Sequence, residues 1–212
     1  MGQDRVHDRG RVTSTRLLLV RHGESTWNVA GRWQGHADPP LSDLGERQAV
    51  AGATALTGPP DAVWTSDLAR ARRTAELLAE PHGLTPRADA RLRERDVGEW
   101  SGLTRAEIEE RWPGWLAARR SPDGFEADEP LAARALAALR EIAAAAPGAT
   151  VIVVTHGGVI RTVERHHGAD PEPVPNLGGR WLVTADTGRF VLGDRQLLID
   201  SDDIEVTVPP PH

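Results

Sequence analysis

The sequence contains no cysteine and no lysine, and these two absences exclude several kinds of chemistry. Without cysteine there is no disulfide, no thiolate nucleophile, no zinc ribbon and no iron–sulfur cluster. Without lysine there is no Walker-A loop for nucleotide phosphates and no Schiff base to pyridoxal phosphate. The chain also lacks an apolar run of the roughly 18 residues that a membrane span needs, so we expect no membrane as partner.

The charge balance and the N-terminal region favour a cytoplasmic protein that does not bind nucleic acid. The 31 acidic residues outnumber the 25 basic residues, and the formal net charge is −6. Proteins that bind nucleic acid usually carry a basic excess instead. Residues 1–16 are polar and rich in arginine, without the apolar segment of a secretory signal.

The length and the order of segments predict a single α/β domain. A chain of 212 residues with 39% hydrophobic content suits one domain with its own core. We assign residues 16–200 to that domain, 1–15 to a flexible N-terminal extension and 201–212 to a loosely held C-terminal tail. Strands alternate with helices along the chain, which is typical of a layered α/β fold with a mostly parallel central sheet.

Two continuous apolar segments predict strands that are buried on both faces, one over residues 16–20 and one over 150–155. Helices are expected from residues 43, 67, 105, 129 and 158, the first three of them with Ser42, Ser66 and Thr104 as N-caps. Shorter strands are expected over residues 61–65, 84–92, 180–185, 190–192 and 196–199.

A histidine follows each of the two apolar strands. Because sites in open α/β sheets lie at the carboxyl ends of strands, we expect His22 and His156 to face each other. Arg21 precedes the first histidine, and Arg70 falls in the first turn of a helix, where the free N–H groups already favour anions. Glycines beside both histidines allow a ligand to approach the backbone. Two guanidinium groups beside two imidazoles predict a site for a phosphate dianion.

These residue types indicate phosphoryl transfer to a histidine. A neutral His22 can attack phosphorus in line and form a phosphohistidine, while the two arginines and His156 hold the equatorial oxygens. The leaving alkoxide needs a proton, and Glu94 is the best candidate for the general acid. We expect burial beside Trp100 to raise the pKa of Glu94 and keep part of it protonated near neutrality.

The ordered motifs resemble those of the histidine phosphatase superfamily, in the branch that includes the cofactor-dependent phosphoglycerate mutases. The resemblance covers about Arg16 to Leu192. It rests on LLLVRHGESTWN (17–28), Gln34-Gly35 followed by LSDLG (41–45), SDLARARRTA (66–75), Leu92-Arg93-Glu94 with its following Gly and Trp, and VTHGGVIR (154–161).

This resemblance implies a three-layer α/β/α sandwich whose chemistry needs no metal and no cofactor. It implies the same roles for the two histidines, the two arginines and Glu94 as those argued above. It adds four secondary substrate contacts: Asn28, Gln34, Gly35 and the N–H of Gly157. Dimers are common in the family, and a homodimer is left open.

Within this family, the sequence favours a metal-independent hydrolase of a small phosphorylated metabolite. A cofactor-dependent phosphoglycerate mutase is the alternative, but mutases carry a longer insertion between the acid loop and the second histidine motif. Residues 123–129 depart from the Gly-Glu-Ser stretch of many phosphatases, so the substrate itself is left open. A non-catalytic phosphate-binding module is the remaining alternative, and the presence of all five core residues disfavours it.

Overall fold

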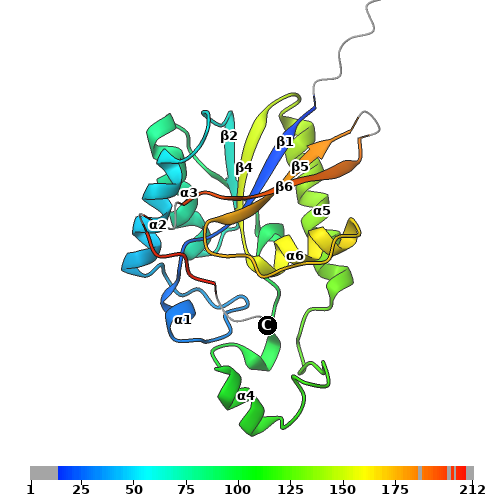
Figure 1. Ribbon diagram of the computed structural model, residues 1–212. Helices are drawn as coiled ribbons and strands as arrows, with labels where there is room; N and C mark the ends of the chain where they lie inside the picture. Colours follow the sequence, from blue (N-terminus) through cyan, green and yellow to red (C-terminus); the bar gives the residue numbers. More distant parts are fainter. Residues whose placement is uncertain (1–13, 186–187, 200–201, 203, 209–212) are drawn as a thin grey trace, which may run out of the picture.

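The computed structural model describes residues 14–185, 188–199, 202 and 204–208, and the expected N-terminal extension lies outside it up to residue 13. Thr15 is buried and its backbone N–H donates to the hydroxyl of Thr184. The central sheet has six strands in the order β3-β2-β4-β1-β5-β6 (Figure 1). The strands are β1 (Arg16–Arg21), β2 (Ala62–Thr65), β3 (Arg87–Ala88), β4 (Thr150–Thr155), β5 (Gly178–Thr184) and β6 (Phe190–Leu197).

The four strands β3, β2, β4 and β1 run parallel, and β5 and β6 join the β1 edge in antiparallel pairs. This confirms the predicted mostly parallel α/β sheet. The two separate strands expected over residues 190–192 and 196–199 are wrong, because β6 runs without interruption to Leu197. The pairing of β6 with β5 shifts its register between Arg180 and Leu182, and the strand continues on both sides of this shift.

Helices cover both faces of the sheet and make a three-layer sandwich (Figure 1). The helices are α1 (Thr26–Val29), α2 (Asp43–Thr54), α3 (Ala69–Ala79), α4 (Arg105–Arg111), α5 (Asp128–Ala145) and α6 (Gly157–His166), with short 3₁₀ turns η1 (Glu80–His82), η2 (Ala90–Leu92) and η3 (Gly98–Trp100). In β1, Leu17 and Leu19 pack in the core beneath α5 and α6, whereas Leu18 and Val20 pack beneath α2 and α3. The predicted burial on both faces is therefore confirmed.

Helix α3 begins at Ala69, two residues later than the sequence predicts. Ser66 does not cap it; its hydroxyl accepts the N–H of Leu68 before the helix starts. The free N–H of Ala69 instead donates to a carboxylate oxygen of Asp38, at 2.6 Å. A residue 31 positions earlier therefore caps this helix, and the local sequence carries no sign of it.

The described part of the C-terminal tail is fastened to the domain, which corrects the expectation of a loose segment. Ile204 and Val206 pack against the core beneath α2 and α3. The side-chain amide of Gln48 donates to the carbonyl of Glu205 at 2.8 Å and to the hydroxyl of Thr207 at 3.2 Å. Apolar side chains spaced two apart, Ile204 and Val206, were the signal for this docking.

A small lobe built on α4 lies beyond the carboxyl ends of the parallel strands (Figure 1). It has its own apolar cluster, which includes Trp33, Trp100 and Ile108. The residues that follow the parallel strands lie between this lobe and the sandwich. Among the described residues, none of the helices combines the length and hydrophobicity that crossing a membrane requires.

Candidate active site

A cavity of about 880 Å³ opens between the sandwich and the α4 lobe, at the carboxyl ends of β1 and β4. Its wall on the lobe side includes the apolar side chains of Trp33, Trp100 and Leu116. Four of the five predicted catalytic residues line the cavity: Arg21, His22, Arg70 and Glu94. The fifth, His156, is fully buried directly behind His22.

The two histidines face each other across neighbouring strands, as the sequence predicts. The register pairs Arg21 of β1 with Thr155 of β4, so the next residue of each strand lies at the same edge of the sheet. The ring centroids of His22 and His156 are 5.1 Å apart, with the ring planes at 63°. This geometry leaves one phosphoryl group within reach of both imidazoles.

His22 is held as a neutral imidazole with one nitrogen free for chemistry. Its Nδ1 lies 2.6 Å from the carbonyl of Gly23, which assigns the proton to Nδ1. The other nitrogen, Nε2, therefore keeps its lone pair and accepts from Nε of Arg70 at 3.3 Å. Burial, followed by the charges of Arg70 and Arg21, holds the pKa of His22 well below its usual value. The ring is a nucleophile rather than a cation at neutral pH.

Both arginines are buried and tied to backbone carbonyls. Arg70 donates to the carbonyls of Gly35 at 3.0 Å and Ala37 at 2.8 Å, and Arg21 donates to Val174 at 2.7 Å. Burial lowers the pKa of each guanidinium to about 10, so both remain charged at neutral pH. Rigid, permanently charged donors of this kind suit the equatorial oxygens of a phosphoryl group.

Neither ring nitrogen of His156 has a hydrogen-bond partner among the described residues, and Nε of Arg21 lacks one there as well. Burial, and then the charge of Arg70, keeps the pKa of His156 well below its usual value. Buried polar atoms normally have partners, so these orphaned groups point to a polar ligand that belongs beside them.

Glu94 bridges the acid loop and the start of α6. One carboxylate oxygen accepts from the backbone N–H of Arg95 at 2.8 Å, and the other accepts from that of Gly158 at 3.0 Å. Burial raises the pKa of Glu94, but these two bonds and the charges of Arg161 and Arg21 outweigh it, and the pKa falls below its ordinary value. The expectation that burial would leave the pKa raised is wrong, because it ignored the helix N-terminus.

The two glycines after His156 make room for the protein's own side chains. A Cβ on Gly158 would lie 2.1 Å from a carboxylate oxygen of Glu94, and one on Gly157 would lie 3.3 Å from Nη1 of Arg21. Gly157 does not itself line the cavity, whereas Gly158 does. Packing against the protein's own side chains therefore requires glycine at position 158, and the predicted contact of the Gly157 N–H with substrate stays a prediction.

The remaining predicted contacts divide into two groups. Gln34 and Gly35 line the cavity. Asn28 lies outside the lining and closes a capping box with Ser25 at the start of α1. The hydroxyl of Ser25 in turn donates to the side-chain oxygen of Gln34 at 3.0 Å. In the ligand-free structure Asn28 therefore supports the cavity wall through Ser25.

Sequence reasoning missed a row of residues along α6 that forms one cavity wall. Gly158, Arg161 and Arg165 are spaced three and four apart, so they share a helix face, and this spacing after His156 was the available signal. Arg165 forms an ion pair with Asp128. Arg161 is partly buried and has no hydrogen bond or ion pair within the described part of the chain.

Two buried polar residues hold the loop after β1: Thr74, which lies within the motif at residues 66–75, and Asn176, which no motif indicated. The side-chain amide of Asn176 donates to the carbonyl of His22 at 2.8 Å, and the hydroxyl of Thr74 accepts from the N–H of Gly23 at 3.0 Å. Asn176 is 154 positions from His22, so no local pattern connects them. Both residues fix the nucleophile through its backbone.

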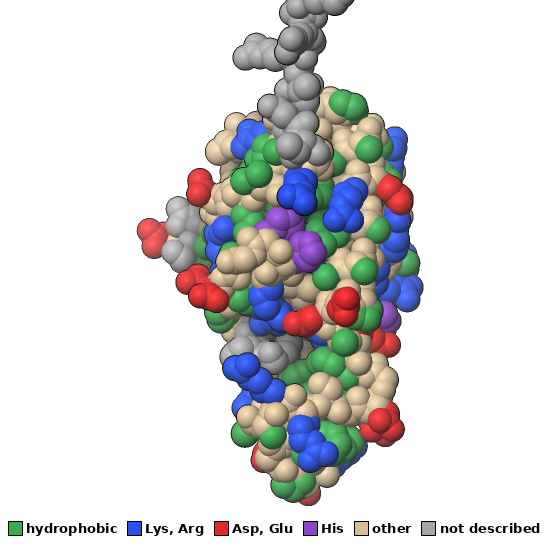
Figure 2. Space-filling view, turned by 90° about the vertical axis from the view of Figure 1, so that its right-hand side faces the viewer, with side chains coloured by type: hydrophobic (Ala, Val, Ile, Leu, Met, Phe, Trp, Pro, Cys, Tyr) green, Lys and Arg blue, Asp and Glu red, His purple; other side chains and the backbone are tan. Residues whose placement is uncertain are grey.

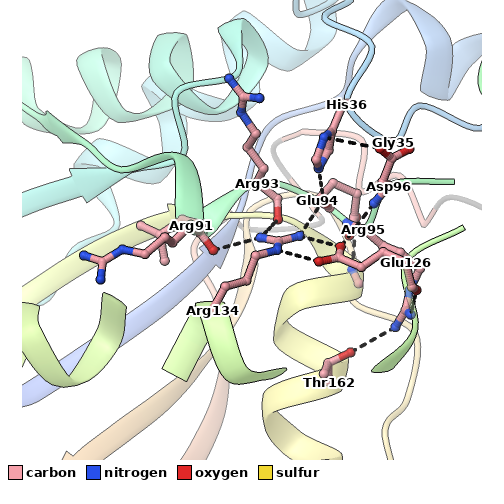
Figure 3. Close-up of polar contacts among 12 residues, drawn as sticks. Gly35, His36, Arg91, Arg93, Glu94, Arg95, Asp96, Glu126, Arg134 and Thr162 are labelled. Atoms are coloured by element: carbon pink, nitrogen blue, oxygen red, sulfur yellow. Dashed lines mark hydrogen bonds and ion pairs between the residues drawn. The ribbon is translucent and has the colours of Figure 1, made fainter. Parts of the chain in front are cut away.

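The loop that carries Glu94 is held by an arginine of α5, Arg134, which donates to the carbonyls of Arg93 and Glu94 (Figure 3).

At the surface, basic and acidic side chains are interspersed over the face seen in Figure 2. Within residues 14–185, 188–199, 202 and 204–208, no cluster of three or more His, Asp or Glu side chains is placed to hold a metal ion.

Comparison with known proteins shows which family the chain belongs to. Residues 17–179 match the family model described as histidine phosphatase superfamily (branch 1). Glucosyl-3-phosphoglycerate phosphatase of Mycobacterium tuberculosis is 42% identical over 163 residues, which cover 70% of this chain and 73% of the relative. Metal-independent phosphoserine phosphatase of Arabidopsis thaliana is 42% identical over 159 residues, which cover 70% of this chain and 67% of the relative. A solved mycobacterial glucosyl-3-phosphoglycerate phosphatase complexed with VO3 matches with a TM-score of 0.75 and 32% identity, covering 84% of this chain and 97% of that one.

Proposed function

Because the chain belongs to branch 1 of the histidine phosphatase superfamily and is a phosphomonoester hydrolase of a small phosphorylated metabolite, we propose that it acts through a phosphohistidine at Nε2 of His22. One observation carries the proposal. His22 is neutral, its Nδ1 is engaged by a backbone carbonyl, and its Nε2 lies among two charged arginines and an unpartnered imidazole. No metal is needed for this chemistry, because the guanidinium groups supply the charge stabilisation.

In the first half-reaction, Arg21, Arg70 and His156 bind the equatorial oxygens of the phosphoryl group. Nε2 of His22 forms the new P–N bond while the P–O bond to the leaving alcohol breaks in line. Glu94 donates the proton that the departing oxygen requires. The alcohol leaves, and the phosphohistidine stays behind with Glu94 ionised.

The proton on Glu94 enters with the substrate. Glu94 is ionised in the ligand-free site, because its pKa lies below the ordinary value. A phosphomonoester has a second pKa of about 6, so its monoanion brings one proton into the site. The negative charge of the bound phosphoryl group raises the pKa of Glu94, which favours moving that proton to the carboxylate.

In the second half-reaction, the ionised Glu94 takes a proton from a water molecule as the water attacks phosphorus. The P–N bond to His22 breaks, and inorganic phosphate leaves with the proton that Glu94 had taken. The neutral imidazole is restored, so atoms and protons balance over the cycle.

Phosphate release from a panel of phosphorylated metabolites tests the function directly. We expect turnover to be unchanged by excess EDTA, because the charge stabilisation comes from arginine. Loss of activity in EDTA that added Mg²⁺ or Zn²⁺ restores would contradict the proposal.

We further propose a substrate that carries a carboxylate near its phosphate. Glucosyl-3-phosphoglycerate and phosphoserine, named for the two relatives, both have one. Arg161 lies one helical turn beyond Gly158 on the cavity wall; its charge acts on Glu94, but it forms no hydrogen bond or ion pair among the described residues. A guanidinium in that position matches a carboxylate.

Arg161→Gln is therefore expected to reduce kcat/KM for 3-phosphoglycerate by about 10- to 100-fold, the range for a hydrogen bond to a charged group. Glycerol 3-phosphate, which has a hydroxymethyl group in place of the carboxylate, should lose less than about 3-fold. Steady-state kinetics on this matched pair give the measurement. Equal losses on both substrates would show that Arg161 acts on Glu94 instead.

A further inference from the structure

Arg134 of α5 uses every one of its N–H donors at the acid loop (Figure 3). Its Nε and one Nη2 hydrogen bind the two carboxylate oxygens of Glu126, both at 2.7 Å. Its Nη1 donates to the carbonyls of Arg91 at 2.8 Å and Arg93 at 2.7 Å, and its Nη2 donates to the carbonyl of Glu94 at 2.9 Å. The five donors of the guanidinium are thus matched to five acceptors.

The segment that carries Glu94 depends on these side-chain bonds. Between η2 and η3 the chain forms neither helix nor strand, so its carbonyls have no regular backbone partners. His36 is the other side chain that reaches the carbonyl of Glu94, with Nε2 at 2.9 Å. Arg134 therefore holds these carbonyls in place, as backbone N–H groups do within a helix or a strand.

Glu126 fixes the same segment from the lobe side. Its backbone N–H donates to the carbonyl of Asp96 at 2.8 Å, and its carbonyl accepts from Nη1 of Arg95 at 2.5 Å. Its carboxylate also receives the N–H of Asp96, at 3.3 Å. The Arg134–Glu126 pair is only partly exposed, with side-chain accessibilities of 20% and 15%, so solvent screens it little.

Glu94 is thereby gripped at both ends. Arg134 holds its carbonyl from α5, and the N–H of Gly158 holds its carboxylate from α6, which packs against α5. Arg134 does not line the cavity and does not reach the reacting atoms. After burial, its charge contributes to the lowered pKa of His156, and its hydrogen bonds reach the site through the backbone of Glu94.

We propose that Arg134, braced by Glu126, is a positioning residue that sets Glu94 at the distance needed to protonate the leaving group. The proposal rests on the proposed function, in which Glu94 is the general acid. A misplacement of about 1 Å is enough to cost roughly 100-fold in rate. A lysine cannot replace Arg134, because an ammonium has three donors and no planar fork.

The test compares two leaving groups in Arg134→Gln, Arg134→Lys and Glu126→Gln. For 3-phosphoglycerate, whose alkoxide needs a proton, we expect kcat to fall by about 10- to 100-fold in both Arg134 variants. For p-nitrophenyl phosphate, whose nitrophenolate leaves unprotonated, we expect the rate of the nitrophenol burst, which reports the first half-reaction alone, to fall less than about 3-fold. Arg140→Gln, an exposed arginine on the same helix, is the control and should change neither value.

Combination with Glu94→Gln separates positioning from general damage. If Arg134 acts through Glu94, adding Arg134→Gln to Glu94→Gln should reduce kcat little further. Equal losses in kcat for 3-phosphoglycerate and in the burst rate for p-nitrophenyl phosphate, or full additivity in the double variant, would overturn the inference. Glu94→Gln without any leaving-group effect would instead overturn the proposed function. If Arg134→Gln does not fold, the same comparisons are made with Arg134→Lys, because lysine keeps the charge and the aliphatic stem.

Discussion

His22→Ala is expected to reduce turnover of every phosphomonoester by at least about 10⁴-fold, because the variant has no atom that can accept the phosphoryl group. The chain has no cysteine or lysine that could take its place as a nucleophile. Phosphate release measured at high enzyme concentration gives the residual rate.

The control is His22→Asn, which keeps most of the side-chain volume and leaves Arg21 and Arg70 in place. Both variants should retain the thermal unfolding midpoint of the wild type within a few degrees. The substitutions remove a buried polar ring that lies beside two positive charges, so little stabilising energy is lost. Residual hydrolysis above a few per cent in a folded His22→Ala protein would contradict nucleophilic catalysis by this residue.

Glu94→Gln is expected to lower kcat for alkyl phosphates by about 10²- to 10⁴-fold, the usual contribution of a general acid. The amide keeps the shape, but its NH2 group cannot accept, so it retains only one of the two N–H bonds from Arg95 and Gly158. A second leaving group that needs no proton therefore separates the missing acid from the lost hydrogen bond. With p-nitrophenyl phosphate the first half-reaction needs no acid. A burst of nitrophenol should therefore remain, followed by slow hydrolysis of the phosphoenzyme.

The pH dependence follows from the lowered pKa of Glu94. Because Glu94 is ionised in the free enzyme, the proton must arrive on the substrate monoanion. The kcat/KM for an alkyl phosphate should thus fall as pH rises above about 6, where the substrate loses its second proton. A plateau that extends to pH 8 would show that Glu94 is protonated in the free enzyme, and would contradict this route.

The parts of the site that the sequence predicts are those joined by strand order. Arg21 ends the apolar strand β1 and His22 follows it, and His156 follows the apolar strand β4, so the pairing of these two strands brings the three residues together. Continuous hydrophobicity is a strong local signal for such strands. The nucleophile and its partner were therefore accessible from pattern alone.

The parts that could not be predicted depend on long-range contacts. Asp38 caps α3 from 31 positions away, and Asn176 reaches the carbonyl of His22 from 154 positions away. Arg134 lies in an alanine-rich helix, where one arginine looks like a solvated residue. The pKa of Glu94 is lowered, against the prediction, because the N–H groups of Arg95 and Gly158 and two arginine charges outweigh the effect of burial.

The stereochemical course at phosphorus tests the central claim most directly. A substrate whose phosphoryl group is made chiral with three oxygen isotopes, when the enzyme transfers that group to an acceptor alcohol, reports each in-line displacement as one inversion. Transfer through His22 requires two displacements and predicts net retention, whether or not the phosphoenzyme accumulates. Net inversion would mean that the acceptor attacks the substrate directly, and it would contradict a phosphohistidine intermediate.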